Sequence, residues 1–217
     1  MGTHSNYDSA WVLGGYQKDF IDKTYLLPRI AKLVNYVSPQ DTQRSLLDLG
    51  CSTGAFLRFA YEHNYTVTGV DISAAALQEV TNIPNVRLKQ LDLSSQKLPF
   101  ESRSFDVVTA FDLVEHIKNP EELFREVSRV LKKEGIFYFI TPNGVQPADH
   151  DETHFSLKKK KEWEALAKKY FTVAESYTYE YYPPPPYLCI QIVLAFVNQL
   201  RRYKIQQVAV IARKTSQ

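Results

Sequence analysis

The chain has 217 residues, a net charge of +2 at pH 7 and an isoelectric point near 8.4. Its length predicts a single domain over 1–217 with a substantial core, and so mild a positive charge argues against a nucleic-acid partner. Two cysteines are too few for a disulfide framework, the polar N-terminus lacks a signal-peptide core, and no apolar run reaches transmembrane length. These features lead us to expect a cytoplasmic protein.

Residues 1–40 are expected to form an N-terminal arm followed by a helical cap. Loop-forming Asn, Asp and Gly residues are frequent in 1–15. The pattern then becomes helical and is interrupted at Pro28. After this break, four apolar residues share one helical face, namely Ile30, Leu33, Val34 and Val37.

A glycine-containing turn follows the first strand of the expected core. The apolar residues of 46–50 predict a buried strand and those of 54–63 predict a helix, with a run of small residues between them. Gly50 and Gly54 allow a ligand to approach the backbone closely, and the free N–H groups of such a turn can face an anionic group. The turn lacks the full G-x-G-x-x-G spacing, so an ordinary strand-to-helix connection is an alternative.

Two further strands end at acidic residues. The run 66–70 leads into Asp71, and the run 86–91 leads into Asp92. Asp71 follows the glycine turn by roughly 20 residues, the spacing at which a carboxylate meets a ribose diol in an open parallel sheet. The acids therefore predict a ligand crevice at the carboxyl ends of the strands, with simple capping of the next segment as the alternative.

Strands and helices continue to alternate through the middle of the chain. We expect a helix over 74–81 that is capped by Ser73, followed by a strand over 105–111. A helix opened by Asn119 and Pro120 should cover 119–135, and another strand should cover 136–140. This alternation predicts a parallel sheet that is covered by helices on both faces.

The C-terminal part departs from the alternation. We expect a helix capped by Ser156 and running to Lys169, then strands over 171–179 and 206–213. The prolines of 183–186 must be extended and cannot continue a sheet. The helix would turn three residues toward the core, namely Trp163, Leu166 and Ala167.

The segment 187–203 is expected to be an apolar helix. It has too many apolar residues for one narrow stripe and is too short to span a bilayer. Core packing would cover one face, and we expect the other to form a homodimer contact or the wall of an apolar pocket. Basic residues at its end, among them Arg201 and Arg202, leave open a peripheral contact with a membrane surface.

Eight short motifs occur in the order and spacing of one enzyme family. They are Leu-Asp-Leu-Gly-Cys-Ser-Thr-Gly (47–54), Gly-Val-Asp-Ile-Ser (69–73), Leu-Asp-Leu (91–93), Leu-Pro-Phe (98–100), Phe-Asp-Val-Val (105–108), Val-Glu-His-Ile (114–117), Arg-Val-Leu-Lys-Lys-Glu-Gly (129–135) and Thr-Pro-Asn (141–143). With these motifs the chain resembles, over about residues 44–180, the class I S-adenosylmethionine-dependent methyltransferases of the small-molecule group that includes ubiquinone and menaquinone biosynthesis enzymes.

The resemblance implies an α/β fold. The sheet would be Rossmann-like, seven-stranded and mostly parallel, in the order 3-2-1-4-5-7-6, with the last strand antiparallel and helices on both faces. The core of 44–180 would bind the cofactor, 1–40 would lie over its pocket and help to form the substrate site, and 181–217 would supply the apolar helix and the last strand.

The resemblance also implies S-adenosylmethionine as cofactor and a small-molecule methyl acceptor. Asp48 would lie beneath the methionine end, where a carboxylate can hold the glycine turn or, through water, the ammonium. The other implied contacts are Gly50, Ser52 and Gly54 along the methionyl moiety, Asp71 at the ribose, Ile72, Asp92 and Leu93 at the adenine, and Phe111 and Asp112 beside the methionine.

Two histidines are candidate catalytic residues. The resemblance puts Glu115 and His116 beside the methyl donor, where His116 could take a proton from a phenol or hydroxyl nucleophile. His116 could equally pack and hydrogen-bond within its loop, and both interpretations stay open. His154 is a second candidate base or substrate contact. The range 149–154 has ligand types that suit a divalent ion, but no element fixes their spacing, and we expect no metal site.

The residues after the fourth strand narrow the substrate class. The Asp/Asn-Pro-Pro-Tyr/Phe motif of many methyltransferases that act on exocyclic amines is replaced here by Phe111-Asp112-Leu113-Val114. This favours O-methylation or C-methylation of a small molecule, with O-methylation first. The alternatives are RNA modification, which the mild charge disfavours, a cofactor-binding scaffold without catalysis, and an NAD-dependent dehydrogenase, which the incomplete glycine pattern disfavours.

Overall fold

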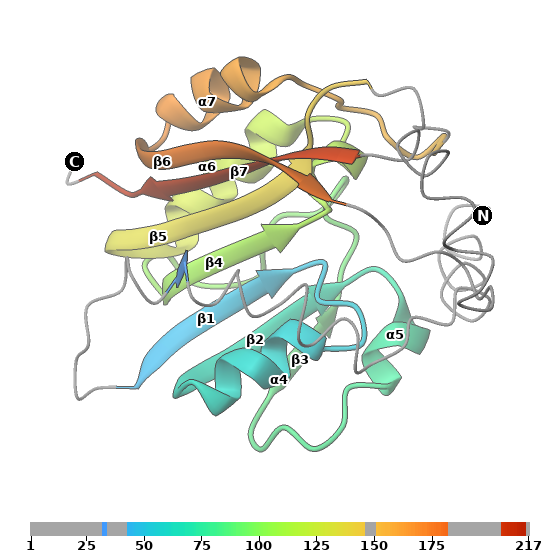
Figure 1. The fold of residues 1–217 in the computed structure, drawn as a ribbon. Coiled ribbons are helices and arrows are strands. Elements are labelled where there is room, and N and C mark those ends of the chain that lie inside the picture. Colours follow the sequence, from blue (N-terminus) through green and yellow to red (C-terminus); the bar gives the residue numbers. More distant parts are fainter. Residues whose placement is uncertain (1–31, 34–42, 146–150, 182–204, 216–217) are drawn as a thin grey trace, which may run out of the picture.

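The computed structural model describes residues 32–33, 43–145, 151–181 and 205–215. In these ranges the strands are β1 (Arg44–Leu49), β2 (Tyr65–Asp71), β3 (Arg87–Gln90), β4 (Phe105–Phe111), β5 (Leu131–Pro142), β6 (Thr172–Tyr181) and β7 (Ile205–Arg213). They form one seven-stranded sheet in the order β3-β2-β1-β4-β5-β7-β6 (Figure 1). β7 is antiparallel to β5 and β6, and the other neighbouring pairs are parallel, so the expected topology is confirmed.

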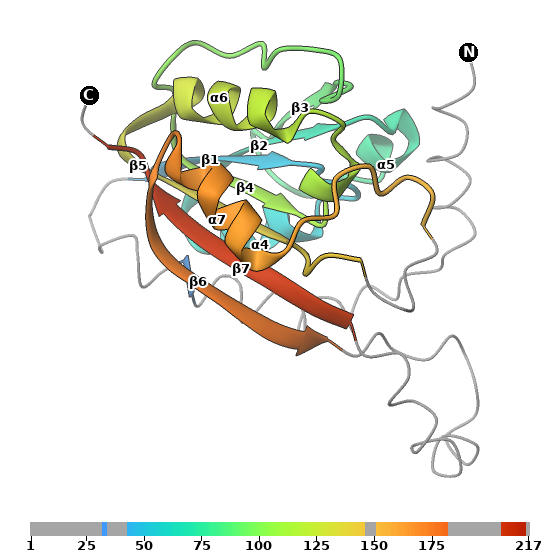
Figure 2. The ribbon, with the colours of Figure 1, turned by 90° about the horizontal axis from the view of Figure 1, so that it is seen from above.

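Helices cover both faces of this sheet, as expected. α6 (Pro120–Val130) and α7 (Lys160–Lys168) lie on one face, and α4 (Ala55–Glu62) lies on the other (Figure 2). A short helix, α5 (Ala74–Gln78), follows β2, and a 3₁₀ turn, η2 (Val114–His116), follows β4. The sheet thus separates two apolar layers, and each layer lies between the sheet and the helices on that face.

An aromatic cluster centred on Phe124 fills the layer under α6 and α7. Its ring centroid lies 5.1 Å from that of Phe137, 5.2 Å from that of Phe139 and 6.2 Å from that of Trp163. The three residues that were expected to face inward from α7, Trp163, Leu166 and Ala167, are all buried. Aromatic pairs such as these, two edge to face and one stacked, stabilise a core beyond their buried area, which fixes both helices on β5.

The layer on the other face combines α4 with part of the N-terminal segment. Phe56, Leu57 and Ala60 of α4 are buried against β1 and β2, and Leu33 is fully buried in the same cluster. A Cβ added to Gly69 of β2 would lie 2.6 Å from the Cys51 sulfur and 2.6 Å from a Leu57 methyl carbon. Only a glycine lets β2 lie this close to the turn that follows β1.

The end of one expected helix and the start of another were wrong. The helix expected over 74–81 ends at Gln78, because the chain then turns through Asn82, which has a positive φ of 60°. The helix expected from Ser156 begins at Lys160. Ser156 is buried, and its amide donates to the backbone oxygen of Glu115 at 2.9 Å, so it anchors a loop instead of capping the helix.

The caps of the other helices agree better with the sequence. The Ser73 hydroxyl accepts a hydrogen bond from the Ala76 amide at 3.1 Å, so the expected N-cap of α5 is confirmed. Asn119 precedes α6, and Pro120 opens it, but the Asn119 side chain makes no capping hydrogen bond. The helix expected to continue to 135 ends at Val130, because Leu131 already has an extended backbone and opens β5.

Some expectations lie outside the described residues. They include most of the 1–40 arm and cap and the whole apolar helix of 187–203, with its proposed homodimer, pocket-wall or membrane-surface contact. Among the residues that the structure does describe, no helix is both long enough and apolar enough to cross a membrane.

Candidate cofactor and catalytic site

The glycine turn between β1 and α4 has an unusual backbone. Gly50, Ser52 and Gly54 have positive φ angles of 71°, 51° and 77°. The amides of Gly50 and Cys51 both donate to the Val70 oxygen, at 2.8 and 3.0 Å, which ties the turn to the end of β2. A Cβ at Gly54 would lie 2.8 Å from a Val80 methyl carbon. The expected turn is therefore present, and its left-handed residues explain the two glycines.

Asp71 braces this turn from the neighbouring strand. One carboxylate oxygen accepts from the Ser52 amide at 2.8 Å, and the other accepts from the Ser73 amide at 2.9 Å. The residue is buried at the end of β2. The two bonds use different oxygens, so the carboxylate connects the turn after β1 to the segment after β2. Asp71 thus caps the segment that follows β2, which the sequence analysis gave as the alternative to a ligand-binding role.

Asp48 lies in the interior directly below the turn. It is buried in β1, and Oδ1 accepts from the Thr109 hydroxyl of β4 at 2.6 Å. Burial raises the pKa of this carboxyl to about 7, the Thr109 hydrogen bond opposes that shift, and the charge of Asp71 adds to it. A group with this pKa can change its charge near neutral pH when a cation comes close.

Asp92 closes a small turn after β3. Its carboxylate accepts from the Ser94 amide at 2.9 Å and from the Ser95 hydroxyl at 2.8 Å. Leu93 packs partly buried against the core, and the Ile72 oxygen accepts from the Gln90 side chain at 3.0 Å. As for Asp71, local capping is present here, and it fixes the direction in which the carboxylate points.

Phe111 is the last residue of β4, and Asp112 follows it directly. The Phe111 ring meets the Phe56 and Tyr138 rings edge to face, at centroid distances of 4.8 and 5.1 Å. Asp112 has a positive φ of 49° and accepts from the Gln207 side-chain amide at 2.6 Å. Burial raises the pKa of Asp112 to about 7, although the Gln207 hydrogen bond opposes the shift.

The 3₁₀ turn η2 places Glu115 and His116 at the same edge of the sheet, just after Asp112. Glu115 is buried and accepts from the Thr141 hydroxyl of β5 at 3.0 Å. Its backbone oxygen accepts from Ser156, so the loop that carries residues 151–156 is attached to this turn. The two candidate histidines consequently meet: the His116 and His154 rings are T-shaped, with centroids 4.7 Å apart.

The loop supports His116 through Thr153, a residue that the sequence did not single out. His116 Nδ1 lies 2.9 Å from the Thr153 hydroxyl and 3.2 Å from the Thr153 backbone oxygen. The Thr153 hydroxyl in turn donates to Asp151 at 2.6 Å, and His154 Nε2 lies 3.7 Å from the same carboxylate. No sequence signal identified Thr153, because its partner His116 is 37 positions away.

Potential metal-ligand atoms of Glu115, His116 and His154 lie within 4.8 Å of one another. Two of the residues in the range 149–154 considered from sequence, Asp149 and His150, fall outside the described ranges. This group of possible ligands differs from the range 149–154 that was considered from the sequence. It brings together His116 and His154, the two candidate catalytic histidines.

Comparison with known proteins identifies the fold that carries this site. A family model described as a methyltransferase domain matches residues 23–180. A ubiquinone biosynthesis O-methyltransferase of Coxiella burnetii is 27% identical over 117 residues, which is 51% of this chain and 49% of that protein. The chain thus spans about half the length of the curated relatives that it matches.

Solved structures agree on the architecture. A chain from the complex of the Haloferax volcanii Trm112 methyltransferase activator with a methyltransferase superposes with a TM-score of 0.73, at 17% identity and 99% coverage of both chains. A Haemonchus contortus phosphoethanolamine N-methyltransferase with bound S-adenosylhomocysteine gives a TM-score of 0.68 at 20% identity, covering 99% of this chain and 58% of that one. Together with the matched family model, these structures show that the chain belongs to the methyltransferase domain family and has the class I S-adenosylmethionine-dependent fold.

Proposed function

We propose that this protein transfers a methyl group from S-adenosylmethionine to a hydroxyl group of a small molecule. The observation that carries the proposal is the left-handed glycine turn braced by Asp71, which lies at the same edge of the sheet as the His116 turn. Such an edge, at the carboxyl ends of parallel strands, is where open α/β sheets bind their ligands. A hydroxyl acceptor is supported by the relatives that match about half of the chain, because they are named as O-methyltransferases.

The residues of the turn would hold the methionine end of the cofactor. The N-terminus of α4 directly follows the left-handed turn of Gly50, Ser52 and Gly54, and it would favour the cofactor carboxylate. Asp48 and Asp112, both with pKa values raised to about 7, would become ionised beside the ammonium and sulfonium charges. Phe111 would form the apolar wall beside the methionine.

The adenosine end would extend over the next two strands. The Asp71 carboxylate would accept from two ribose hydroxyls, and such charge-assisted hydrogen bonds are roughly twice as strong as neutral ones. Ile72 would flank the adenine ring. Asp92 would accept from the adenine amino group while its turn bonds to Ser94 and Ser95 keep it oriented, and the Leu93 amide would donate to a ring nitrogen.

Methyl transfer is an in-line displacement at a carbon that the cofactor already activates through its sulfonium charge. The oxygen of the acceptor forms the new C–O bond as the C–S bond breaks, and the sulfur keeps the electron pair. The protein orients the two reactants, excludes water and takes the hydroxyl proton. We assign the last role to His116, with His154 as a neighbouring acceptor contact.

The proposal is tested by following a labelled methyl group from S-adenosylmethionine to a panel of phenol, catechol and 4-hydroxybenzoate, with aniline as the amine counterpart. We expect transfer to at least one phenol and none to aniline. Transfer to aniline alone would overturn the hydroxyl assignment. Binding of the cofactor without any transfer would indicate a scaffold, provided that an activator protein like that of the Haloferax volcanii neighbour is not required.

The role of His116 has its own test. Replacing the general base should lower turnover by roughly 10²-fold, because that is the usual contribution of a positioned base. His116→Ala should therefore lose turnover while its affinity for S-adenosylmethionine stays near that of wild type. Normal turnover by this variant would show that His116 is not the base and only packs within its loop. His63→Ala is the matched control, since this histidine lies at the end of α4, away from the carboxyl edge of the sheet.

A further inference from the structure

The hydrogen bonds around His116 determine which of its ring nitrogens carries the proton. The Thr153 hydroxyl has one hydrogen to donate. Its oxygen lies 2.6 Å from an oxygen of the Asp151 carboxylate, and an ionised carboxylate can only accept. Partial burial would raise the Asp151 pKa, but two hydrogen bonds from Thr153 and the charges of His154 and His116 hold it below its usual value. Asp151 is therefore ionised at neutral pH, and the Thr153 hydrogen is directed to it.

Nδ1 of His116 must then be the donor in both of its contacts with Thr153. The hydroxyl oxygen at 2.9 Å has no hydrogen left to give, and the backbone oxygen at 3.2 Å can only accept. Two independent contacts thus require a hydrogen on Nδ1. In the neutral ring the lone pair is consequently on Nε2, since only one nitrogen of a neutral imidazole is protonated.

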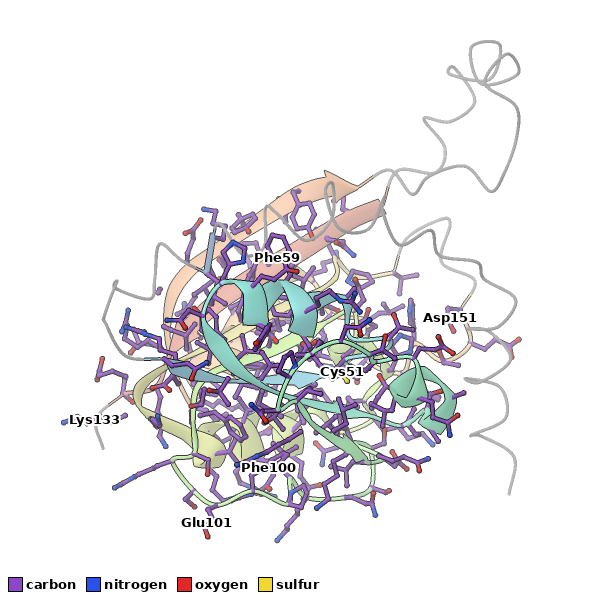
Figure 3. The ribbon with its side chains drawn as sticks, turned by 90° about the horizontal axis from the view of Figure 1, so that it is seen from below. Cys51, Phe59, Phe100, Glu101, Lys133 and Asp151 are labelled. Carbon is purple, nitrogen blue, oxygen red and sulfur yellow. The ribbon has the colours of Figure 1, made fainter. Side chains whose placement is uncertain are left out.

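Asp151 is the first member of this chain of bonds. It also accepts from the Thr153 amide at 2.8 Å, so it fixes both the rotation of the hydroxyl and the local path of the backbone. Figure 3 shows Asp151 at the periphery of the molecule, whereas the labelled Cys51 of the glycine turn lies in the interior. A carboxylate outside the core therefore reaches the histidine through a single threonine.

We propose that Asp151 is a positioning residue, which acts through Thr153 to hold His116 in the Nδ1–H tautomer with its lone pair on Nε2. The use of that lone pair as the proton acceptor rests on the proposed function. The tautomer itself is a property of the protein alone. Without Asp151, the Thr153 hydroxyl is released and can donate to Nδ1, which would move the ring hydrogen to Nε2 and remove the basic lone pair from that atom.

The tautomer can be read directly in protein labelled with ¹⁵N-histidine. Long-range ¹H–¹⁵N correlation spectra distinguish a protonated ring nitrogen from one with a lone pair, and His116→Gln identifies the His116 signals. We expect wild type to be the Nδ1–H form. In Asp151→Ala the ratio of the two tautomers should move toward Nε2–H by about threefold to tenfold, the equivalent of one ordinary hydrogen bond.

Four further variants sharpen this test. Asp151→Asn keeps an oxygen that can accept from Thr153 and should restore the wild-type ratio. The double variant Asp151→Ala with Thr153→Val should also return to Nδ1–H, because no hydroxyl is left to compete and the backbone oxygen still accepts. Glu152→Gln and Glu152→Ala remove an exposed charge next to the network and should leave the ratio unchanged.

Turnover provides the second readout, with S-adenosylmethionine and catechol as the acceptor probe. The kcat of Asp151→Ala should fall by the same factor as the Nδ1–H population, with KM for S-adenosylmethionine unchanged. A wild-type ring in the Nε2–H form, or an Asp151→Ala ratio equal to wild type, overturns the proposal. A fall in the Nδ1–H population without a matching fall in kcat overturns the positioning role. Because the spectra need neither cofactor nor acceptor, they decide the tautomer even if no methyl transfer is found.

Discussion

Asp48 makes the stability of the fold depend on pH in an unusual direction. Its pKa is raised by burial from 3.8 to about 7, so between these values the unfolded chain has lost the proton and the folded protein has kept it. The free energy of unfolding therefore falls as pH rises through this window, by about 1.4 kcal/mol for each pH unit. Above pH 7 the loss is complete, and below pH 4 it is absent.

Asp48→Asn removes this titration and keeps an oxygen that can accept from Thr109. Relative to wild type, the variant should gain stability as the pH is raised from about 5 to about 8. Urea unfolding at the two pH values measures the difference, and other titrating groups cancel because they are common to both proteins. An equal difference at both values would mean that Asp48 is ionised in the folded state throughout the range.

Gly69 shows how tightly the second strand lies on the glycine turn. A methyl group at this position would be 2.6 Å from both the Cys51 sulfur and a Leu57 carbon, and both residues are buried. Gly69→Ala should therefore destabilise the protein by about 1–3 kcal/mol through overpacking. Thr66→Ser, at an exposed position of the same strand, is the control. Thermal melts with the same midpoint for Gly69→Ala and wild type would refute this packing.

At the scale of elements, β7 is connected to the loop after β4 by one side chain. The Gln207 amide donates to Asp112 at 2.6 Å, and its oxygen accepts from the Tyr179 hydroxyl of β6 at 2.5 Å. Gln207→Leu should cost about 1–3 kcal/mol, because it removes a hydrogen-bond partner from a group that is mostly hidden from water. Gln206→Leu, at the exposed neighbouring position, should cost less, and equal losses in chemical denaturation would contradict the link.

Element positions in the core followed from local patterns, whereas loop positions did not. The strand expected over 105–111 has those bounds in the structure, because a buried parallel strand is apolar along most of its length. The start of α7 was wrong because Ser156, a good cap by type, is held by the backbone of Glu115 from another part of the chain. Local residue preferences cannot report a contact that depends on how distant segments meet.

For the whole molecule, the motifs and their resemblance to a known family predicted the strand order, which periodicity alone would have left open. They also predicted the edge where the acids and histidines gather. The chain of bonds from Asp151 to His116 was not predicted, because Thr153 has no distinguishing neighbours in sequence and its role depends on a loop folded back onto η2. The proposed cofactor contacts thus follow from short motifs, whereas the contacts proposed to orient His116 depend on tertiary structure.

The central claim, that the turn braced by Asp71 binds S-adenosylmethionine, is tested most directly by calorimetric titration of that cofactor. We predict one site per chain and an affinity at least tenfold weaker in Asp71→Asn, which keeps the shape of the side chain but loses its charge. Glu101→Gln, an exposed acid in a loop, should bind like wild type. Equal affinities of wild type and Asp71→Asn, or no binding by a folded wild-type protein, would contradict the account.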